Sequence, residues 1–336
     1  MSIRVGINGF GRIGRNFLRA TKQQGADIDF VAVNDLGSLD TMAHLLKRDS
    51  VAGAYPGTVE VVDGGIKVDG DVIKVTSERN PADIPWGELG VDVVIESTGI
   101  FTSREKAAAH LEGGAPRVIV SAPCTEADAT FVVGVNDDTF DPAKDIVVSN
   151  ASCTTNCFVP LIKVLDDAFG VQKGLMNTIH AYTGDQMLVD GPHSDLRRAR
   201  AAAINIVPTS TGAARATALV LESMKGRLDG TSLRVPVPTG SITDFTGLLD
   251  KDVTVDEVNA AFRAAASEGR LKGILDYSEE PLVSSDIVGS PFSSIFDSGL
   301  TMAQGNLIKV LSWYDNESGY SNRLVDLAKI VGAANQ

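Results

Sequence analysis

Cys153 and His180 are the residues of this chain whose types best suit covalent catalysis, as a thiol nucleophile and its base. Cys153 follows a β-rich run and opens an apolar helical stretch, and the N-terminus of a helix stabilises a thiolate. Ser152 and Thr154 flank the thiol and offer hydroxyl and N–H donors to the oxyanion of a reacting substrate. The pattern predicts a nucleophile at Cys153, although it also fits a cysteine that is only a small buried residue.

The two other cysteines suggest no second reactive centre. Cys157 lies one helical turn after Cys153, but no further cysteine or histidine joins the pair as a metal ligand, so we predict no metal site. We interpret Cys157 and Cys124 as structural residues.

The chain has four histidines, and one of them suits the role of a general base. His44 and His110 lie in helix-like stretches of the first third and are interpreted as structural residues, and His193 lies in a polar loop. His180 ends a β-like run in the second half, and from there it could face Cys153 across a cleft. The sequence alone leaves this contact open.

A glycine-rich segment near the N-terminus predicts a dinucleotide site. Residues 9–14 read Gly-Phe-Gly-Arg-Ile-Gly and lie between a β-like run and a helix-like stretch. Glycines there permit a tight turn and close approach of a pyrophosphate to the helix N-terminus. Asp35 ends the next β-like run, 21 residues after Gly14. A carboxylate at that place binds a ribose 2′-hydroxyl and repels a 2′-phosphate, which predicts NAD rather than NADP.

The surrounding segments predict an α/β fold with two domains. Residues 1–151 alternate strand-like and helix-like stretches, which predicts a Rossmann-type doubly wound parallel sheet with an antiparallel insertion at 59–75. Residues 152–316 lack that alternation and predict an α+β catalytic domain with a mixed, largely antiparallel sheet. We expect a C-terminal helix within 317–336 to pack back on the first domain. The strands expected are 3–7, 29–33, 91–95, 117–120, 146–149, 175–181, 232–237, 242–249 and 307–314, and the helices include 12–24, 212–225 and 255–267.

Composition and charge disfavour several classes of function. The net charge of −13 argues against a dedicated nucleic-acid or membrane partner, because both kinds of partner attract basic surfaces. No apolar run approaches the ~18 residues of a membrane span, and no leader-like segment precedes the first strand. An odd number of cysteines, three, is typical of a reducing compartment. We therefore expect a cytoplasmic protein.

Six motifs together resemble the phosphorylating glyceraldehyde-3-phosphate dehydrogenase family. They are INGFGRIGR at 7–15, SNASCTTN at 149–156, HAYTGDQ at 180–186, DLRRARAAA at 195–203, PTSTGAA at 208–214 and WYDNESGYS at 313–321. The motifs follow the family's order and cover the chain from end to end. The resemblance implies oxidation of D-glyceraldehyde 3-phosphate to 1,3-bisphosphoglycerate, with NAD as oxidant and inorganic phosphate as second substrate.

The resemblance also implies roles for single residues. Cys153 would form a thiohemiacetal and then a thioester, and His180 would accept the thiol proton and assist hydride departure. One anion site would comprise Thr183 and Arg234, with Arg198 near the substrate phosphates. The other anion site would comprise Ser152, Thr211 and Gly212. The expected cofactor contacts are Gly9, Gly11, Arg12, Ile13, Gly14, Asp35, Arg79, Ser121 and Asn316, the last on the nicotinamide amide.

The resemblance to the family also implies an oligomeric state and leaves one departure from its pattern. Its members are usually homotetramers, in which the loop after His180 reaches the neighbouring cofactor site. Many NAD-specific members carry Leu-Pro where this chain has Gly191-Pro192, so Gly191 departs from the usual pattern.

The alternative enzyme is an erythrose-4-phosphate dehydrogenase, but that branch usually differs around the HAYT segment. An RNA-binding or scaffolding role on the same fold is disfavoured by the acidic charge.

Overall fold

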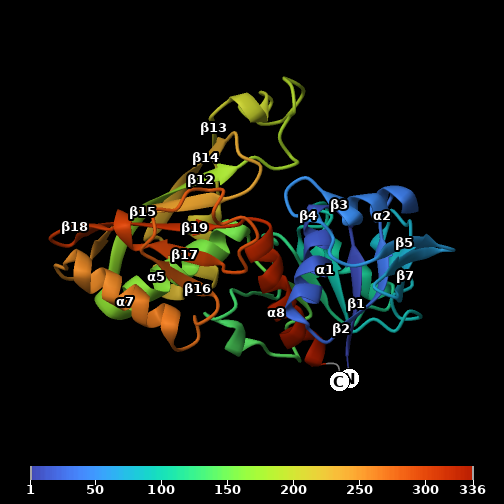
Figure 1. Ribbon diagram of the computed structural model, residues 1–336. Coiled ribbons are helices and arrows are strands. Elements are labelled where there is room, and N and C mark those ends of the chain that lie inside the picture. The colour runs from blue at the N-terminus through green and yellow to red at the C-terminus, as the bar shows by residue number, and fades with distance from the viewer. Residues whose placement is uncertain (1, 335–336) are drawn as a thin grey trace. The chain divides into compact units, whose positions relative to one another are not determined.

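A computed structural model describes residues 2–334, which form two compact units (Figure 1). The first unit comprises residues 2–131, 137–151 and 321–334, and the second comprises residues 132–136 and 152–320. Residues 335 and 336, the end of the expected C-terminal segment, lie outside the described residues. Among residues 2–334, no helix has both the length and the apolar character needed to span a bilayer.

The first unit is built on a nine-stranded sheet in the order β10-β11-β9-β8-β1-β2-β7-β6-β5. All neighbours from β10 to β7 pair in parallel, whereas β5, β6 and β7 pair antiparallel through Asp-Gly turns. The strands are β1 (Ile3–Asn8), β2 (Ile28–Asn34), β5 (Val59–Val62), β6 (Gly65–Val68), β7 (Asp71–Thr76), β8 (Val93–Glu96), β9 (Val118–Val120), β10 (Ala129–Thr130) and β11 (Val147–Ser149), with the separate pair β3 (Arg48–Asp49) and β4 (Gly53–Ala54). The doubly wound sheet and its antiparallel insertion are confirmed. The chain reverses its direction of winding between β1 and β8, where such sheets bind ligands.

The helices of the first unit pack apolar faces on this sheet. The helix α1 (Arg12–Gln24) has the predicted bounds, and its Phe17 meets Phe30 of β2 edge to face, with ring centroids 5.6 Å apart. The others are α2 (Leu39–Lys47), α3 (Arg104–Ala107) and α4 (Ala109–Glu112). The final helix α8 (Ser318–Ala333) enters this unit from residue 321 onward, and its Asn322 Oδ1 accepts a hydrogen bond of 2.8 Å from Gln24 Nε2.

The second unit is built on an eight-stranded mixed sheet in the order β13-β14-β12-β15-β19-β17-β16, with β18 added on β19. Only the pairs β12–β14 and β16–β17 are parallel, so the predicted mixed, largely antiparallel sheet is confirmed. Its strands are β12 (Val171–Ala181), β13 (Val207–Ser210), β14 (Leu228–Val235), β15 (Ser241–Leu249), β16 (Leu275–Ser278), β17 (Ser294–Asp297), β18 (Met302–Gln304) and β19 (Leu307–Tyr314). The helices α5 (Cys153–Phe169) and α7 (Val255–Ser267) pack against each other, and α5 contacts β12, β15, β17 and β19 (Figure 1).

The single helix predicted over 212–225 is wrong. The segment divides into α6 (Ala213–Ala216) and two short 3-10 turns, Thr217–Leu219 and Glu222–Met224. Thr217 lies at the break, and its hydroxyl bonds the carbonyl of Ala213, which competes with regular helix propagation. Val220 follows it, and β-branched side chains restrict χ1 against the preceding turn of a helix.

Candidate active site

The start of α5 fixes the position of Cys153. Ser152 is the N-cap residue, and its hydroxyl accepts a hydrogen bond of 3.0 Å from the backbone N–H of Thr155. Cys157, Phe158 and the other buried residues of α5 anchor the helix on the sheet. Cys153 is therefore held at the first helical position, half-buried, where unpaired backbone N–H groups favour a negative charge.

The strand β12 brings His180 to this thiol. Nε2 of His180 lies 3.4 Å from Sγ of Cys153, and Nδ1 lies 2.7 Å from the carbonyl oxygen of Ala181. Nδ1 also lies 3.2 Å from Arg234 Nη1, which only donates, but that nitrogen has its acceptors in the Ala181 carbonyl and the Thr183 hydroxyl. The shorter contact of Nδ1 with a carbonyl oxygen, which only accepts, assigns the hydrogen to Nδ1 and the lone pair of the neutral ring to Nε2. The ring is therefore oriented to accept the proton of the Cys153 thiol. The contact that the sequence left open is present.

Burial opposes ionisation of both members of this pair before substrate binds. Burial raises the pKa of the Cys153 thiol, against the positive charge of Arg234 and the hydrogen bonds of Thr154. Burial and the Arg234 guanidinium lower the pKa of His180 to about 3. For the thiol, burial therefore opposes the helix N-terminus, whose N–H groups favour the thiolate. Proton transfer from Sγ to Nε2 must accompany attack on a substrate.

Tyr314 supports this pair and was not predicted from the sequence. Its hydroxyl lies 2.8 Å from each of the Thr154 and Thr178 hydroxyls, and its ring meets that of His180 edge to face, with centroids 5.9 Å apart. The three hydroxyls join the first turn of α5 to β12 and β19. The only sequence signal was the place of Tyr314 inside the WYDNESGYS motif.

A cluster of charges lies beside His180. Arg234 is the parallel-register partner of His180 on β14, and its Nη1 donates to Thr183 Oγ1 at 2.8 Å and to the Ala181 carbonyl at 3.1 Å. Arg198 Nη1 donates to Asp185 at 2.7 Å, and the Thr183 hydroxyl also donates to Asp185. The structure thus brings together Thr183, Arg198 and Arg234, and it adds Asp185, which was not predicted as a site residue.

One nitrogen of this cluster has no partner. The Nε atom of Arg234 is buried, and among the described residues no group accepts its hydrogen. A buried guanidinium N–H without an acceptor is costly, and an anion bound beside the cluster would satisfy it. The donor set of two guanidinium groups and a threonine hydroxyl suits a phosphate.

The residues expected at the second anion site lie on two segments. Ser152 caps α5, and Thr211 and Gly212 form the link from β13 to α6, which packs against α5. The Thr211 hydroxyl accepts the backbone N–H of Ala213 at 3.2 Å. The Thr154 hydroxyl is buried against Tyr314.

In the first unit, a cavity of about 390 Å³ opens at the carboxyl ends of β1, β2 and β8. Its lining includes Asn8, Gly9, Gly11, Asn34, Asp35, Arg79 and Thr98. The Asp35 carboxylate accepts the backbone N–H of Phe10 at 2.7 Å and that of Gly37 at 2.9 Å. Each oxygen keeps a further lone pair, which suits the hydroxyls of a ribose.

The three glycines of the motif have different structural surroundings. Gly9 has a φ of +92°, and a Cβ there would lie 2.8 Å from the backbone nitrogen of Thr98. A Cβ on Gly14 would lie 2.3 Å from the carbonyl oxygen of Gly9. A Cβ on Gly11 would meet no atom within 4 Å. Protein packing therefore explains Gly9 and Gly14, whereas the space beside Gly11 is open to a ligand.

The other predicted cofactor contacts have diverse surroundings. Arg12 forms an ion pair with the buried Asp49, Ile13 lies half-buried in the first turn of α1, and Ser121 follows β9. In the second unit, Asn316 Oδ1 accepts the N–H of Gly240 at 3.2 Å and the Ser241 hydroxyl at 3.1 Å, which fixes the amide orientation and leaves its nitrogen as a donor. In the first unit, the carboxylate of Asp35 and the open space at Gly11 thus suit NAD. In the second unit, the oriented amide of Asn316 does so.

The fold and the two sites define a class of protein. A doubly wound sheet with a dinucleotide cavity, together with a cysteine thiol beside a neutral imidazole, is typical of a dehydrogenase that works through a thiol.

Comparison with known proteins defines the family. The model of the glyceraldehyde 3-phosphate dehydrogenase NAD binding domain matches residues 3–104, and that of the C-terminal domain matches residues 152–316. The glyceraldehyde-3-phosphate dehydrogenase of Streptomyces coelicolor is 64% identical over 333 residues, and that of Mycobacterium avium is 62% identical over 338 residues. Each alignment covers 99% of both chains. The chain belongs to the glyceraldehyde-3-phosphate dehydrogenase family and is an NAD-dependent oxidoreductase.

Proposed function

We propose that this chain oxidises and phosphorylates D-glyceraldehyde 3-phosphate to 1,3-bisphosphoglycerate, through a thioester on Cys153. The observation that carries the proposal is the 3.4 Å contact of Cys153 Sγ with the unprotonated Nε2 of His180, beside the guanidinium of Arg234. The curated relatives carry the name of this enzyme, which disfavours an erythrose-4-phosphate dehydrogenase.

Cys153 and His180 exchange one proton in each half of the reaction. As Sγ bonds the aldehyde carbon, the thiol proton passes to Nε2 and from there to the carbonyl oxygen, which becomes the hydroxyl of a thiohemiacetal. NAD, when bound, supplies the acceptor for the hydride that leaves this carbon. Nε2 takes the hydroxyl proton as the thioester forms. A phosphate oxygen then attacks the thioester, the C–S bond breaks, and the thiolate regains its proton from His180.

The charged cluster beside His180 would hold the phosphate groups. Thr183, Arg198 and Arg234 supply one anion site, and Ser152, Thr211 and Gly212 supply a second near the start of α5. Desolvation lowers the pKa of Arg234, but the pKa of an arginine is so high that the group stays charged. Asp185 holds Thr183 and Arg198 in place before an anion arrives.

Replacement of Arg234 tests this assignment. We expect Arg234→Gln to lower kcat/KM for glyceraldehyde 3-phosphate by about a hundredfold or more, since a charged hydrogen bond to phosphate contributes roughly 1.5–3 kcal/mol and Nη1 also holds the strand end beside His180. Steady-state kinetics over a range of substrate and phosphate concentrations measure the loss. Arg263→Gln, which removes an exposed arginine paired with Glu279, is the matched control. Equal kinetics of both variants would contradict the anion site.

The two glycines of the cofactor motif give a paired test of NAD binding. Gly11→Ala adds a Cβ in open space, so we expect an unchanged melting temperature and NAD affinity weakened roughly tenfold. Gly14→Ala drives a Cβ into the carbonyl oxygen of Gly9, so we expect a lower melting temperature, as backbone strain destabilises the fold. Calorimetry and NAD titration distinguish the two effects. Full NAD affinity in Gly11→Ala would remove the ligand explanation for this glycine.

We assign separate roles to the two parts of the chain. Residues 1–151, with the helix of the C-terminal segment 317–336, would bind NAD, and residues 152–316 would carry out catalysis. The family models support this division, because they match residues 3–104 and 152–316. Asp35 favours NAD over NADP, and a kcat/KM for NADP equal to that for NAD would overturn the preference.

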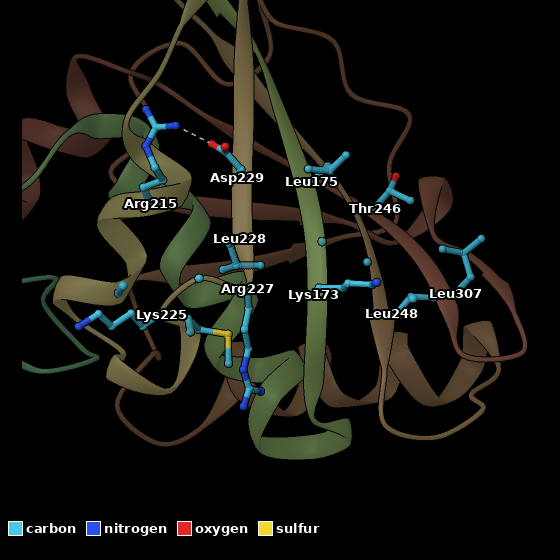
Figure 2. Close-up of a pocket in the computed structure, with 15 residues that line it drawn as sticks. Lys173, Leu175, Arg215, Lys225, Arg227, Leu228, Asp229, Thr246, Leu248 and Leu307 are labelled. Atoms are coloured by element: carbon cyan, nitrogen blue, oxygen red, sulfur yellow. Dashed lines mark hydrogen bonds and ion pairs between the residues drawn. The ribbon is translucent and has the colours of Figure 1, made fainter.

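A homotetramer in the cytoplasm is the proposed state of the enzyme. The outer face of the second sheet carries a groove of about 770 Å³, where Figure 2 shows Leu175, Leu248 and Leu307 among basic residues. Leu188 and Leu196, in the loop after His180, are each 82% exposed. Apolar surface of this extent favours association with further copies of the chain. Light scattering on the purified protein measures the mass, and a monomer would refute the tetramer.

The substrate is tested by the initial rate of NADH formation. We expect fast turnover of glyceraldehyde 3-phosphate that requires inorganic phosphate, and slower turnover of erythrose 4-phosphate. Preference for erythrose 4-phosphate would overturn the substrate assignment while leaving the thiol chemistry intact.

A further inference from the structure

A buried carboxylate lies below the dinucleotide cavity of the first unit. Glu96 ends β8 and is 2% exposed. Its Oε2 lies 2.6 Å from Asn8 Nδ2 and 2.9 Å from His110 Nε2, and its Oε1 accepts the backbone N–H and the hydroxyl of Thr98. The other hydrogen-bond partners of Asn8 and His110 determine which of their atoms carry hydrogen.

The hydrogen bonds of His110 allow only one tautomer of its neutral ring. Trp86 Nε1 donates to His110 Nδ1 at 2.9 Å, and an indole nitrogen is a donor only. Nδ1 therefore carries the lone pair, and Nε2 carries the hydrogen that is donated to Glu96. Both side chains are fully buried, so no solvent offers another arrangement.

The amides of Asn34 and Asn8 are also fixed. The backbone N–H of Glu78 donates to Asn34 Oδ1 at 2.8 Å, and Asn34 Nδ2 donates to the Glu78 carbonyl at 2.9 Å. Asn34 Nδ2 also donates to Asn8 Oδ1 at 2.8 Å, which leaves Asn8 Nδ2 to donate to Glu96. Asn8 and His110 are thus two donors to one oxygen, and the 3.4 Å between their nitrogens is not a hydrogen bond.

Three paths of hydrogen bonds run to Glu96. Each path begins at a group that can only donate, namely the indole N–H of Trp86 or the backbone N–H of Glu78 or Thr98. If either amide turned over or the imidazole changed tautomer, two donors would face each other in a buried site. Only a group that accepts at both of its ends satisfies this arrangement, and a carboxylate is such a group.

The network also forms part of the cavity wall. Asn8, Asn34 and Thr98 line the same cavity as Asp35. We propose that Glu96 is a positioning residue of the cofactor site, which orients Asn8 and Thr98 directly and Asn34 through Asn8, with His110 as its fixed donor. The inference rests on the proposed binding of NAD in this cavity. It gives His110 a role beyond the structural one predicted from the sequence.

Glu96→Gln is the direct test, because it keeps the shape and replaces one oxygen by a donor. In either orientation, the NH₂ group of the new glutamine faces a donor that cannot become an acceptor, namely the backbone N–H of Thr98 or the nitrogens of Asn8 and His110. We expect the NAD dissociation constant, measured by calorimetry, to rise roughly tenfold. We expect kcat at saturating NAD and the alkylation rate of Cys153 to stay within about twofold, since the second unit is unaltered. A lower melting temperature with unchanged NAD affinity would overturn the proposal, because it marks a purely structural residue.

Two further variants complete the experiment. His110→Leu removes a donor from Glu96 without altering a residue that lines the cavity, and we expect a roughly threefold weaker NAD complex even if Glu96→Gln does not fold. Unchanged affinity in His110→Leu would overturn the role of His110 as the fixed donor. Asp71→Asn, in an exposed ion pair with Lys22, is the matched control and should bind NAD normally. A wild-type protein that bound no NAD would overturn the proposed function instead.

Discussion

Cys153→Ser is expected to lower turnover by about four orders of magnitude or more. A hydroxyl has a far higher pKa than a thiol, so an imidazole that can accept the proton of a thiol is too weak a base to activate a serine. Enzymes that lose their nucleophile show a fall in kcat of similar size. Initial rates of NADH formation measure the change.

The same variant should keep its fold and its cofactor. Serine preserves the helix start, because the N-cap hydroxyl belongs to Ser152. We therefore expect NAD affinity and melting temperature close to those of the wild type. Cys157→Ser is the matched control, since that thiol lies among the hydroxyls of Ser294 and Thr243 and should be replaced without loss of turnover. Residual activity of Cys153→Ser above about a hundredth of the wild type would contradict covalent catalysis at this position.

His180→Asn is expected to slow formation of the thioester by about a hundredfold or more, the usual effect of losing a general base. Without Nε2 as acceptor, the thiol must ionise to solvent, so its apparent pKa should rise further above the ordinary value. The pH dependence of alkylation by iodoacetamide measures that pKa. His44→Asn, on the exposed face of α2, is the matched control. A thiol that titrates unchanged in His180→Asn would show that His180 is not its partner.

The lowered pKa of His180 also makes the fold sensitive to acid. The folded protein holds this ring neutral down to a pKa of about 3, whereas the unfolded chain protonates it near 6.5. The unfolded state then binds more protons, so stability falls as the pH drops from about 6.5 towards 3. The melting temperature of His180→Asn should therefore decline less steeply over this range.

Local patterns predicted the elements whose signals are short-range. The bounds of α1 and α7 follow from their apolar periodicity, and the Asp-Gly turns placed the antiparallel strands of the first sheet. The prediction of one helix over 212–225 failed because the Thr217 hydroxyl bonds the carbonyl of Ala213, a local competition that an apolar pattern does not reveal.

Contacts between distant residues set the limit of prediction. Tyr314 reaches Thr154 across 160 positions, and Glu96 reaches Asn8 across 88. No spacing rule predicts such pairs, because β-sheet register, not sequence distance, brings them together. The resting pKa values of Cys153 and His180 likewise depend on burial, which only the folded structure shows.

The most direct test of the central claim is mass spectrometry of the enzyme mixed with glyceraldehyde 3-phosphate and NAD in the absence of inorganic phosphate. The account predicts an acyl adduct on Cys153 that forms together with a stoichiometric burst of NADH and disappears when phosphate is added. No adduct, or an adduct on another residue, would contradict a thioester on Cys153.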